Sequence, residues 1–131
     1  MIVVDNSAIV DLLLQQPINE ELRNRLEAAG ELHAPHLLDI EFLSVLRRMV
    51  SRSLIDSTSA GEAKAIFEAL PIERYPHTPL LDRIWALRHN LTAYDATYVA
   101  LSETLGLPLV TSDRKLADAP GNLAKIEAYA R

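Results

Sequence analysis

Four acidic residues stand where their carboxylates could act together. Asp5 ends one apolar run, and Asp113 follows another. Glu41 and Asp95 fall in the first turns of segments with a helical pattern. Carboxylates that converge without matching cations repel one another, so their convergence implies a bound divalent metal ion. Because the chain has no cysteine and no clustered histidine, an all-oxygen site would suit Mg²⁺, with Mn²⁺ as a substitute, better than Zn²⁺.

Such a site has an evident chemistry. One or two hard cations held by these acids would neutralise a phosphodiester, lower the pKa of a bound water and stabilise the leaving oxygen. Neutral oxygens able to orient water or the carboxylates are supplied at the same place by Asn6, Ser7, Thr111 and Ser112. Metal-assisted hydrolysis of a phosphodiester is therefore the favoured interpretation.

Each acid also has a purely structural explanation, and for three of them it is helix capping. Asp5 and Asp113 could cap the helical segments that follow them, by accepting hydrogen bonds from backbone N–H groups. Asp95 lies three residues after Thr92, which matches a Thr-x-x-Asp capping box. On this interpretation each acid stabilises a helix terminus, and no metal is needed.

Glu41 is the acid that capping explains least well. The segment around it, APHLLDIEFLSVLRRMV, has an apolar stripe formed by Leu38, Phe42, Val45, Leu46 and Met49. At about 100° per residue, Glu41 lies about 60° from Leu38 and about 40° from Val45, on the flank of the buried face. A carboxylate there is costly unless it is paired or bound to metal. An ion pair with Arg48 is the structural alternative.

The elements that carry these acids give them a common location. Short apolar runs alternate with longer helical segments, which predicts an α/β fold: a parallel sheet with helices on both faces and right-handed crossovers. The expected strands are Ile2–Asp5, Leu32–Ala34, Ile72–Tyr75, Pro108–Thr111 and Lys125–Ala128. The expected helices are Ser7–Gln15, Pro17–Ala29, His36–Arg52, Ser57–Leu70, Pro79–His89 and Ala93–Leu105. Functional groups gather beyond the carboxyl ends of such strands, so all four acids should project to one rim.

Length and composition set the broad class. A chain of 131 residues is expected to form one domain, spanning residues 1–131. With 49% hydrophobic and 24% charged residues, it has the composition of a soluble globular protein. No apolar stretch approaches the ~18–20 residues that span a membrane, and no charged-then-apolar leader precedes the first strand. Together with the absence of cysteine, this favours the cytoplasm.

The net charge of −5 is unevenly distributed. Residues 1–41 hold eight acids and two bases, whereas the rest of the chain holds ten acids and eleven bases. A basic footprint for nucleic acid is missing, so such a partner would be held by a local patch or a bound cation. The candidate phosphate contacts are Arg47, Arg48, Arg52, Arg114 and Lys115. Ordinary solvation of helix ends is the alternative for all of them.

The chain resembles the PIN-domain nucleases, and in particular the VapC toxins of bacterial toxin–antitoxin modules, in three stretches. In chain order these are IVVDNSAIVDLL, APHLLDIEFLSVLRR and AYDATYVALSETLGLPLVTSDRKL. The resemblance implies that the catalytic, metal-binding acids are Asp5, Glu41, Asp95 and Asp113. Ser7 matches the small polar residue near the first acid of the family, and Thr111 matches the hydroxyl residue before the last.

The resemblance also implies a fold and a biological role. It implies a five-stranded parallel sheet, dependence on Mg²⁺ or Mn²⁺, and endonucleolytic cleavage of structured RNA such as tRNA or rRNA. It further implies a homodimer inhibited by a small VapB-like antitoxin within a larger assembly. Many relatives carry another acid two residues after the last one, where this chain has Lys115; the next acid is Asp118.

Apolar residues outside the main stripe predict a surface for a partner. On the helix of Glu41, the residues Ile40, Leu43 and Val50 point away from that stripe, which predicts contact with the antitoxin or a second subunit. Trp85, by contrast, is expected in the core rather than as a base-stacking platform.

Two other functions compete with nuclease activity. A phospho-acceptor domain also places acids at the ends of parallel strands, but it usually pairs two acids after the first strand, whereas Asp5 is followed by Asn6. The other is a catalytically inactive PIN-like module that acts through binding or regulation. Lys115, which replaces an acid of many relatives, keeps that alternative open.

Overall fold

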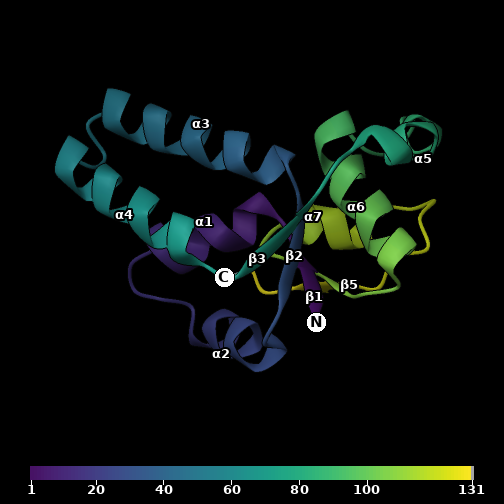
Figure 1. The fold of residues 1–131 in the computed structure, drawn as a ribbon, viewed down its shortest axis with the longest axis horizontal. Coiled ribbons are helices and arrows are strands. Elements are labelled where there is room, and N and C mark those ends of the chain that lie inside the picture. The colour runs from purple at the N-terminus through teal and green to yellow at the C-terminus, as the bar shows by residue number, and fades with distance from the viewer. Residues whose placement is uncertain (131) are drawn as a thin grey trace.

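The computed structural model describes residues 1–130, and at its centre five parallel strands form one sheet (Figure 1). In chain order the strands are β1 (Ile2–Val4), β2 (Leu32–Pro35), β3 (Ile72–Tyr75), β4 (Leu109–Thr111) and β5 (Ile126–Ala128). They lie in the order β3-β2-β1-β4-β5, and every neighbouring pair is parallel. The predicted α/β class with a five-stranded parallel sheet is confirmed.

The first strand occupies the middle of this sheet. Val3 pairs with His33 of β2 on one side and with Leu109 of β4 on the other. From β1 the chain forms β2 and β3 on one side and then returns to form β4 and β5 on the opposite side. An open parallel sheet leaves a crevice where its strand order reverses in this way, at the carboxyl ends of the strands. Asp5 directly follows β1 at this place.

Helices cover both faces of the sheet. They are α1 (Asn6–Leu14), α2 (Glu20–Ala29), α3 (Leu37–Ser51), α4 (Ser57–Ala69), the 3₁₀ turn η1 (Thr78–Leu80), α5 (Leu81–Ala86), α6 (Ala93–Leu105) and α7 (Arg114–Asp118). Figure 1 shows α1, α3 and α4 on one side of the strands and α5 and α6 on the other, as predicted. Within residues 1–130, no helix has the length and apolar character needed to cross a bilayer.

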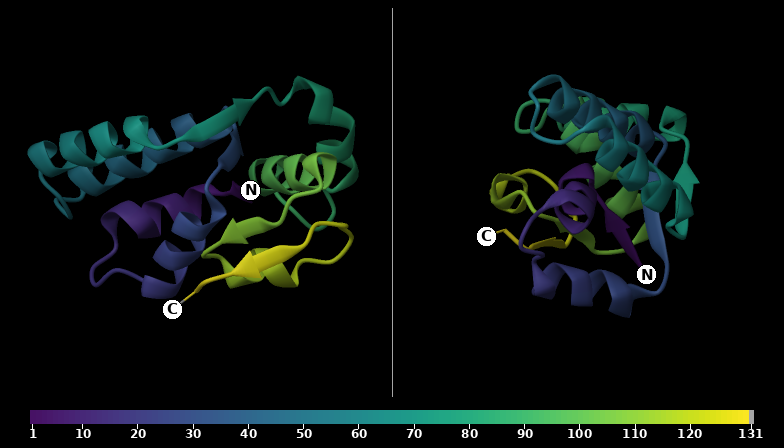
Figure 2. Two further views of the ribbon diagram at one scale, coloured as in Figure 1. Left: turned by 60° about the horizontal axis from the view of Figure 1, so that its bottom comes forward. Right: turned by 90° about the vertical axis from the view of Figure 1, so that its left-hand side faces the viewer.

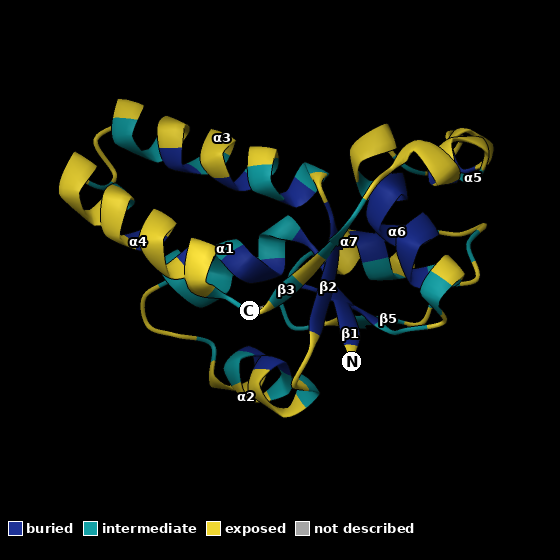
Figure 3. Ribbon diagram, viewed as in Figure 1, coloured by how far each residue is buried: buried dark blue, intermediate teal, exposed yellow. Residues whose placement is uncertain are grey.

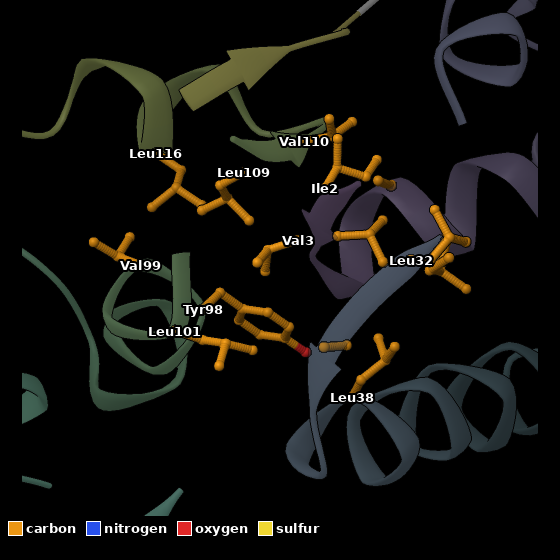
Figure 4. Packing of buried hydrophobic residues seen from close by; sticks show 14 of the residues in the cluster. Ile2, Val3, Leu32, Leu38, Tyr98, Val99, Leu101, Leu109, Val110 and Leu116 are labelled. Carbon is orange, nitrogen blue, oxygen red and sulfur yellow. The ribbon is translucent and has the colours of Figure 1, made fainter. Parts of the chain in front are cut away.

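The deepest part of the core lies between β1 and α6 (Figure 3). The strand β1 is completely shielded from solvent, and every residue from Ala96 to Ser102 of α6 is buried. Helix α6 packs against β1, β2 and β4, and Figure 4 shows its side chains meeting those of the strands. This burial fixes the first turn of α6, which carries Asp95, beside the end of the central strand.

The helices α3 and α4 form a hairpin that extends from the sheet (Figure 2). They pack against each other and against α1. The rings of Phe42 and Phe67 stack between them, with centroids 4.3 Å apart. Three of the five residues of the predicted inner stripe, Leu38, Phe42 and Leu46, are buried, whereas Val45 and Met49 are partly exposed. On the outer face of α3, Ile40 is 67% exposed and Leu43 is 41% exposed.

Two predicted helices differ from the structure. The helix expected to start at Pro17 begins at Glu20, because the side chain of Asn19 caps it by accepting a 3.2 Å hydrogen bond from the backbone N–H of Leu22. The helix expected over Pro79–His89 is divided into η1 and the short α5, which ends at Ala86.

The expected burial of Trp85 is wrong. Its side chain is 67% exposed on α5, and the guanidinium carbon of Arg88 lies 4.4 Å from the centroid of its ring. The buried side of this region is formed instead by Leu80 and Leu87. Because the helix is interrupted, a periodic pattern taken over its full expected length assigns Trp85 to the wrong face.

Candidate active site

A cleft of about 390 Å³ lies at the carboxyl ends of β1 and β4. It is lined by Asp5, Asn6, Ser7, Val10, Asp11, Glu41, Val45, Arg48, Asp95, Tyr98 and Asp113. The four acids singled out in the sequence therefore reach one cleft from four separate segments of the chain. These segments are the start of α1, the second turn of α3, the start of α6 and the start of α7.

Asp5 is the most deeply buried of these acids, with 5% of its surface exposed. It is the N-cap of α1: its Oδ1 accepts hydrogen bonds from the backbone N–H of Ala8 at 3.0 Å and from the hydroxyl of Ser7 at 2.7 Å. Its Oδ2 accepts a 2.5 Å hydrogen bond from the hydroxyl of Thr111. Burial raises the pKa of Asp5 to about 6, the three hydrogen bonds oppose this rise, and the charge of Asp95 adds to it.

Ser7 and Thr111 connect the ends of the two central strands. Their hydroxyl oxygens lie 3.1 Å apart. Ser7 Oγ also accepts a 3.0 Å hydrogen bond from the backbone N–H of Ser112, and Thr111 Oγ1 accepts one of 2.9 Å from that of Asp113. Ser7 and Thr111 therefore fix the position of Asp5 relative to the loop that carries Asp113. Ser112 contributes its backbone N–H here, and its side chain does not line the cleft.

Glu41 receives its hydrogen bond from Tyr98, a residue that the predicted site did not include. The hydroxyl of Tyr98 donates to Oε1 of Glu41 at 2.5 Å. Burial raises the pKa of Glu41, the bond from Tyr98 opposes this rise, and the charge of Asp95 adds to it. The alternative partner, Arg48, lines the same cleft but forms no ion pair with Glu41 in the structure.

The remaining two acids stand at helix starts. Thr92 caps α6 by accepting a 3.1 Å hydrogen bond from the backbone N–H of Asp95, as the capping motif predicts. Burial and the negative charge of Asp113 raise the pKa of Asp95. Asp113 caps α7 by accepting a 2.9 Å bond from the backbone N–H of Lys115. Capping and a place in the cleft are therefore compatible.

The donor set of the cleft fits a hard divalent cation. Within residues 1–130, no Lys, Arg or His forms a salt bridge with any of the four acids. Asn6 adds an amide oxygen, Oδ1, which is buried and has no hydrogen-bond partner among the described residues. The acids are close enough to raise one another's pKa values, yet no three acidic or histidine side chains of residues 1–130 form a compact ligand cluster. The chemistry of the donors suits Mg²⁺ or Mn²⁺.

The candidate phosphate contacts divide by position. Arg48 lines the cleft beside the acids. Arg47 instead lines an apolar groove between α3 and α4, and Arg52 ends α3. Arg114 and Lys115 are exposed at the start of α7, next to Asp113. The structure thus brings one of the five into the cleft, places two at its edge and leaves two outside it.

Two further polar residues, Asp11 and Tyr98, line the cleft, and Asp118 does not. Asp118 ends α7, is exposed and does not line the cleft. Asp11 does line it, four residues after Ser7 and so on the same face of α1. Tyr98 lies three residues after Asp95 on α6, and the same spacing argument indicates that it faces the cleft. Their helical spacing from Ser7 and Asp95 is the sequence signal that predicts Asp11 and Tyr98 on the cleft side of their helices.

Comparisons with known proteins show the family of the chain. The family model described as the PIN domain matches residues 2–122. The VapC ribonuclease Mb0985 of Mycobacterium bovis is 45% identical over 118 residues, covering 90% of each chain. Ribonuclease VapC12 of Mycobacterium tuberculosis is 40% identical over 131 residues, covering 99% of this chain and 100% of its own.

A solved structure shares the fold. The toxin–antitoxin complex from Klebsiella pneumoniae contains a chain that superposes with a TM-score of 0.68 at 16% identity, covering 98% of both chains. The family model matches most of the chain, along residues 2–122, and the two mycobacterial proteins are 40–45% identical to it. The five-stranded parallel sheet agrees with this match. The chain belongs to the PIN domain family.

Proposed function

We propose that this PIN domain protein is an endoribonuclease that depends on a divalent cation, Mg²⁺ with Mn²⁺ as a substitute, and acts as the toxin of a toxin–antitoxin pair. The observation that carries the proposal is the meeting of four carboxylates from separate chain segments in one cleft of about 390 Å³, with no salt bridge to a basic residue within residues 1–130. The relatives named VapC ribonuclease support the same activity.

Each acid has a part in this proposal. The cation would be held by Asp5, Glu41, Asp95 and Asp113. When bound, it would supply the positive charge that neutralises the scissile phosphodiester and lowers the pKa of a water molecule. Hydrogen bonds from Ser7, Ala8 and Thr111 already hold the carboxylate of Asp5 in one orientation. Binding of the cation would therefore not have to restrict this side chain further.

The RNA itself would be held by few protein cations, because the whole chain carries a net charge of −5. Arg48 is the basic residue in the cleft, and Arg114 and Lys115 stand at its edge. These groups would contact phosphates on either side of the cleaved bond. Structured RNA, either a tRNA or a ribosomal RNA, is the proposed substrate class, and the cytoplasm is the proposed place of action.

The proposed partners are a VapB-like antitoxin and a second copy of this chain. Ile40 and Leu43 expose apolar surface along α3, and Val50 lines a groove of about 430 Å³ between α3 and α4. Exposed apolar surface of this kind is typical of interaction sites. The toxin–antitoxin complex from Klebsiella pneumoniae, which shares the fold, supports an antitoxin as one of the partners. Replacing Leu43 by Asp should abolish co-purification with the co-expressed antitoxin, and light scattering of the purified protein tests the homodimer.

Cleavage of RNA by the purified protein, freed of any partner, tests the activity. Total tRNA and ribosomal RNA should be cut in the presence of Mg²⁺, left intact in EDTA, and cut again when Mn²⁺ is added. Asp5→Asn should lower the cleavage rate by at least about 100-fold, because it removes one charge from the ligand set. Glu62→Gln, an exposed acid of α4 outside the cleft, is the matched control and should cleave normally. Full activity of Asp5→Asn, or activity that survives EDTA, would refute the proposal.

A further inference from the structure

Tyr98 lies at the boundary between the core and the cleft. It follows Asp95 by three residues on α6, so the two side chains share a face of this helix. The residue is 2% exposed, and Figure 4 shows its ring among the core side chains, with the hydroxyl oxygen on the side of Leu38. Leu38 belongs to α3, one turn before Glu41. The ring of Tyr98 thus extends from α6 towards α3, where its hydroxyl meets Glu41.

The hydroxyl at the end of this ring has a defined partner. It donates a 2.5 Å hydrogen bond to Oε1 of Glu41, a distance typical of a hydroxyl bound to a carboxylate. No donor within residues 1–130 forms a hydrogen bond with the other oxygen, Oε2. The bond therefore fixes one oxygen of Glu41 and leaves the second available to a ligand in the cleft.

Glu41 needs such a partner more than the other acids do. Asp5 and Asp113 are fixed as N-caps of α1 and α7 by bonds from backbone N–H groups. Asp95 is a short side chain in the first turn of α6. Glu41 has a longer side chain inside α3, where no free backbone N–H is present, and it would otherwise lose rotamer freedom on binding a ligand. The hydroxyl of Tyr98 orients the carboxylate of Glu41, as backbone N–H groups orient those of Asp5 and Asp113.

We propose that Tyr98 is a positioning residue, which holds the carboxylate of Glu41 ready to bind the divalent cation of the cleft. This inference rests on the proposed function. A phenylalanine would fill the same space in the core, so the hydroxyl is the part of Tyr98 that packing does not require. Removing a group that forms a hydrogen bond with a metal ligand lowers the affinity for the metal by roughly 10- to 100-fold.

The test is a calorimetric titration of the purified protein with Mn²⁺, in the absence of RNA. Tyr98→Phe keeps the ring and should weaken Mn²⁺ binding by about 10-fold. Tyr94→Phe makes the same change one turn earlier on α6, at a residue that is 60% exposed, and should bind Mn²⁺ like the wild type. Equal affinity of Tyr98→Phe and the wild type would overturn the inference.

A double-mutant cycle separates positioning from general damage to the fold. Glu41→Asp keeps the carboxylate but withdraws it from the hydroxyl of Tyr98, so Tyr98→Phe should then cause less than about a two-fold further loss of Mn²⁺ affinity. A full 10-fold loss in both backgrounds would show that Tyr98 acts independently of Glu41, and would overturn the inference.

The cleavage assay provides a second readout. Raising the Mn²⁺ concentration should restore the RNA cleavage rate of Tyr98→Phe, because its defect lies in metal affinity. A rate that stays low at every Mn²⁺ concentration would contradict this. If the wild type itself takes up no Mn²⁺, both the proposed function and this inference fail. If the wild type binds Mn²⁺ and Tyr98→Phe matches it, the inference alone fails.

Discussion

Thr111, at the end of β4, donates a 2.5 Å hydrogen bond to Asp5, which follows β1, although 106 residues separate the two in the chain. The parallel pairing of β1 with β4 places both residues at the same edge of the sheet. Thr111 is fully buried and Asp5 nearly so. A buried carboxylate is thus held at the crevice where the strand order reverses, by a side chain from the neighbouring strand.

Replacing Thr111 by Val should destabilise the protein at neutral pH. Valine keeps the shape of the side chain but leaves a buried carboxylate without one of its donors, which costs about 1–3 kcal/mol of the free energy of unfolding. Thr104→Val, at an exposed position of α6, should change this free energy by less than about 0.5 kcal/mol. Urea denaturation of both variants measures the difference, and equal stability would contradict the stabilising role of the hydroxyl.

The buried carboxylate of Asp5 should make stability depend on pH in the absence of metal. Its pKa is raised from 3.8 to about 6, so the folded state binds this proton more tightly than the unfolded chain does. The contribution of Asp5 to the free energy of unfolding should therefore fall by about 3 kcal/mol as the pH rises from below 3.8 to well above 6, and should remain lower at higher pH.

Asp5→Asn is the variant that tests this pH dependence. Because it has no carboxylate to ionise, it should be more stable than the wild type in EDTA at pH 7.5 and similar to it at pH 4. Urea denaturation at the two pH values measures both differences. A wild type that is the more stable protein at pH 7.5 in EDTA would contradict the prediction. The same variant separates loss of activity from loss of fold, since it should be inactive and yet well folded.

A divalent cation should stabilise the folded protein. Binding to the folded state alone raises the free energy of unfolding by about 2.7 kcal/mol when the free cation is about 100-fold above its dissociation constant. Asp95→Asn should lose most of this gain, whereas Glu62→Gln on α4 should retain it. Thermal unfolding with and without Mn²⁺ reports the shift. An equal shift in all three proteins would place the cation outside the cleft.

Arg48 and Arg47 form a matched pair on α3, one inside the cleft and one outside it. Arg48→Ala should weaken RNA binding and lower the slope of log affinity against log salt concentration by about 1, because one phosphate contact is lost. Arg47→Ala should leave both quantities unchanged. Filter binding in EDTA, in which RNA is bound without being cut, measures them. Equal effects of the two substitutions would argue against a phosphate contact specific to Arg48.

The sequence was informative where local pattern decides structure. The apolar run before Asp5 marks the central strand, and the Thr92–Asp95 spacing marks the start of α6; both are confirmed. The α/β class follows from the alternation of such elements. The carboxyl ends of parallel strands meet at one edge of the sheet, so four acids that are far apart in the chain line the same cleft.

The sequence was less informative where two distant elements meet. The bond between Tyr98 and Glu41 depends on how α6 and α3 face each other across 57 residues, which no local pattern reports. Trp85 was misplaced because α5 is shorter than its apolar pattern indicates. Arg47 and Arg48 look alike in the chain, yet the turn of the helix between them puts one in the cleft and the other in the groove between α3 and α4.

We propose that Asp5, Glu41, Asp95 and Asp113 together bind a divalent cation in the cleft. Anomalous diffraction from a crystal soaked in Mn²⁺ tests this proposal, because the anomalous signal of manganese marks the position of the ion. We expect a peak in the cleft, in contact with carboxylate oxygens of these acids, and no such peak in a soaked crystal of Asp5→Asn. A cleft without anomalous density in the wild type, or a peak that persists unchanged in Asp5→Asn, would contradict the claim.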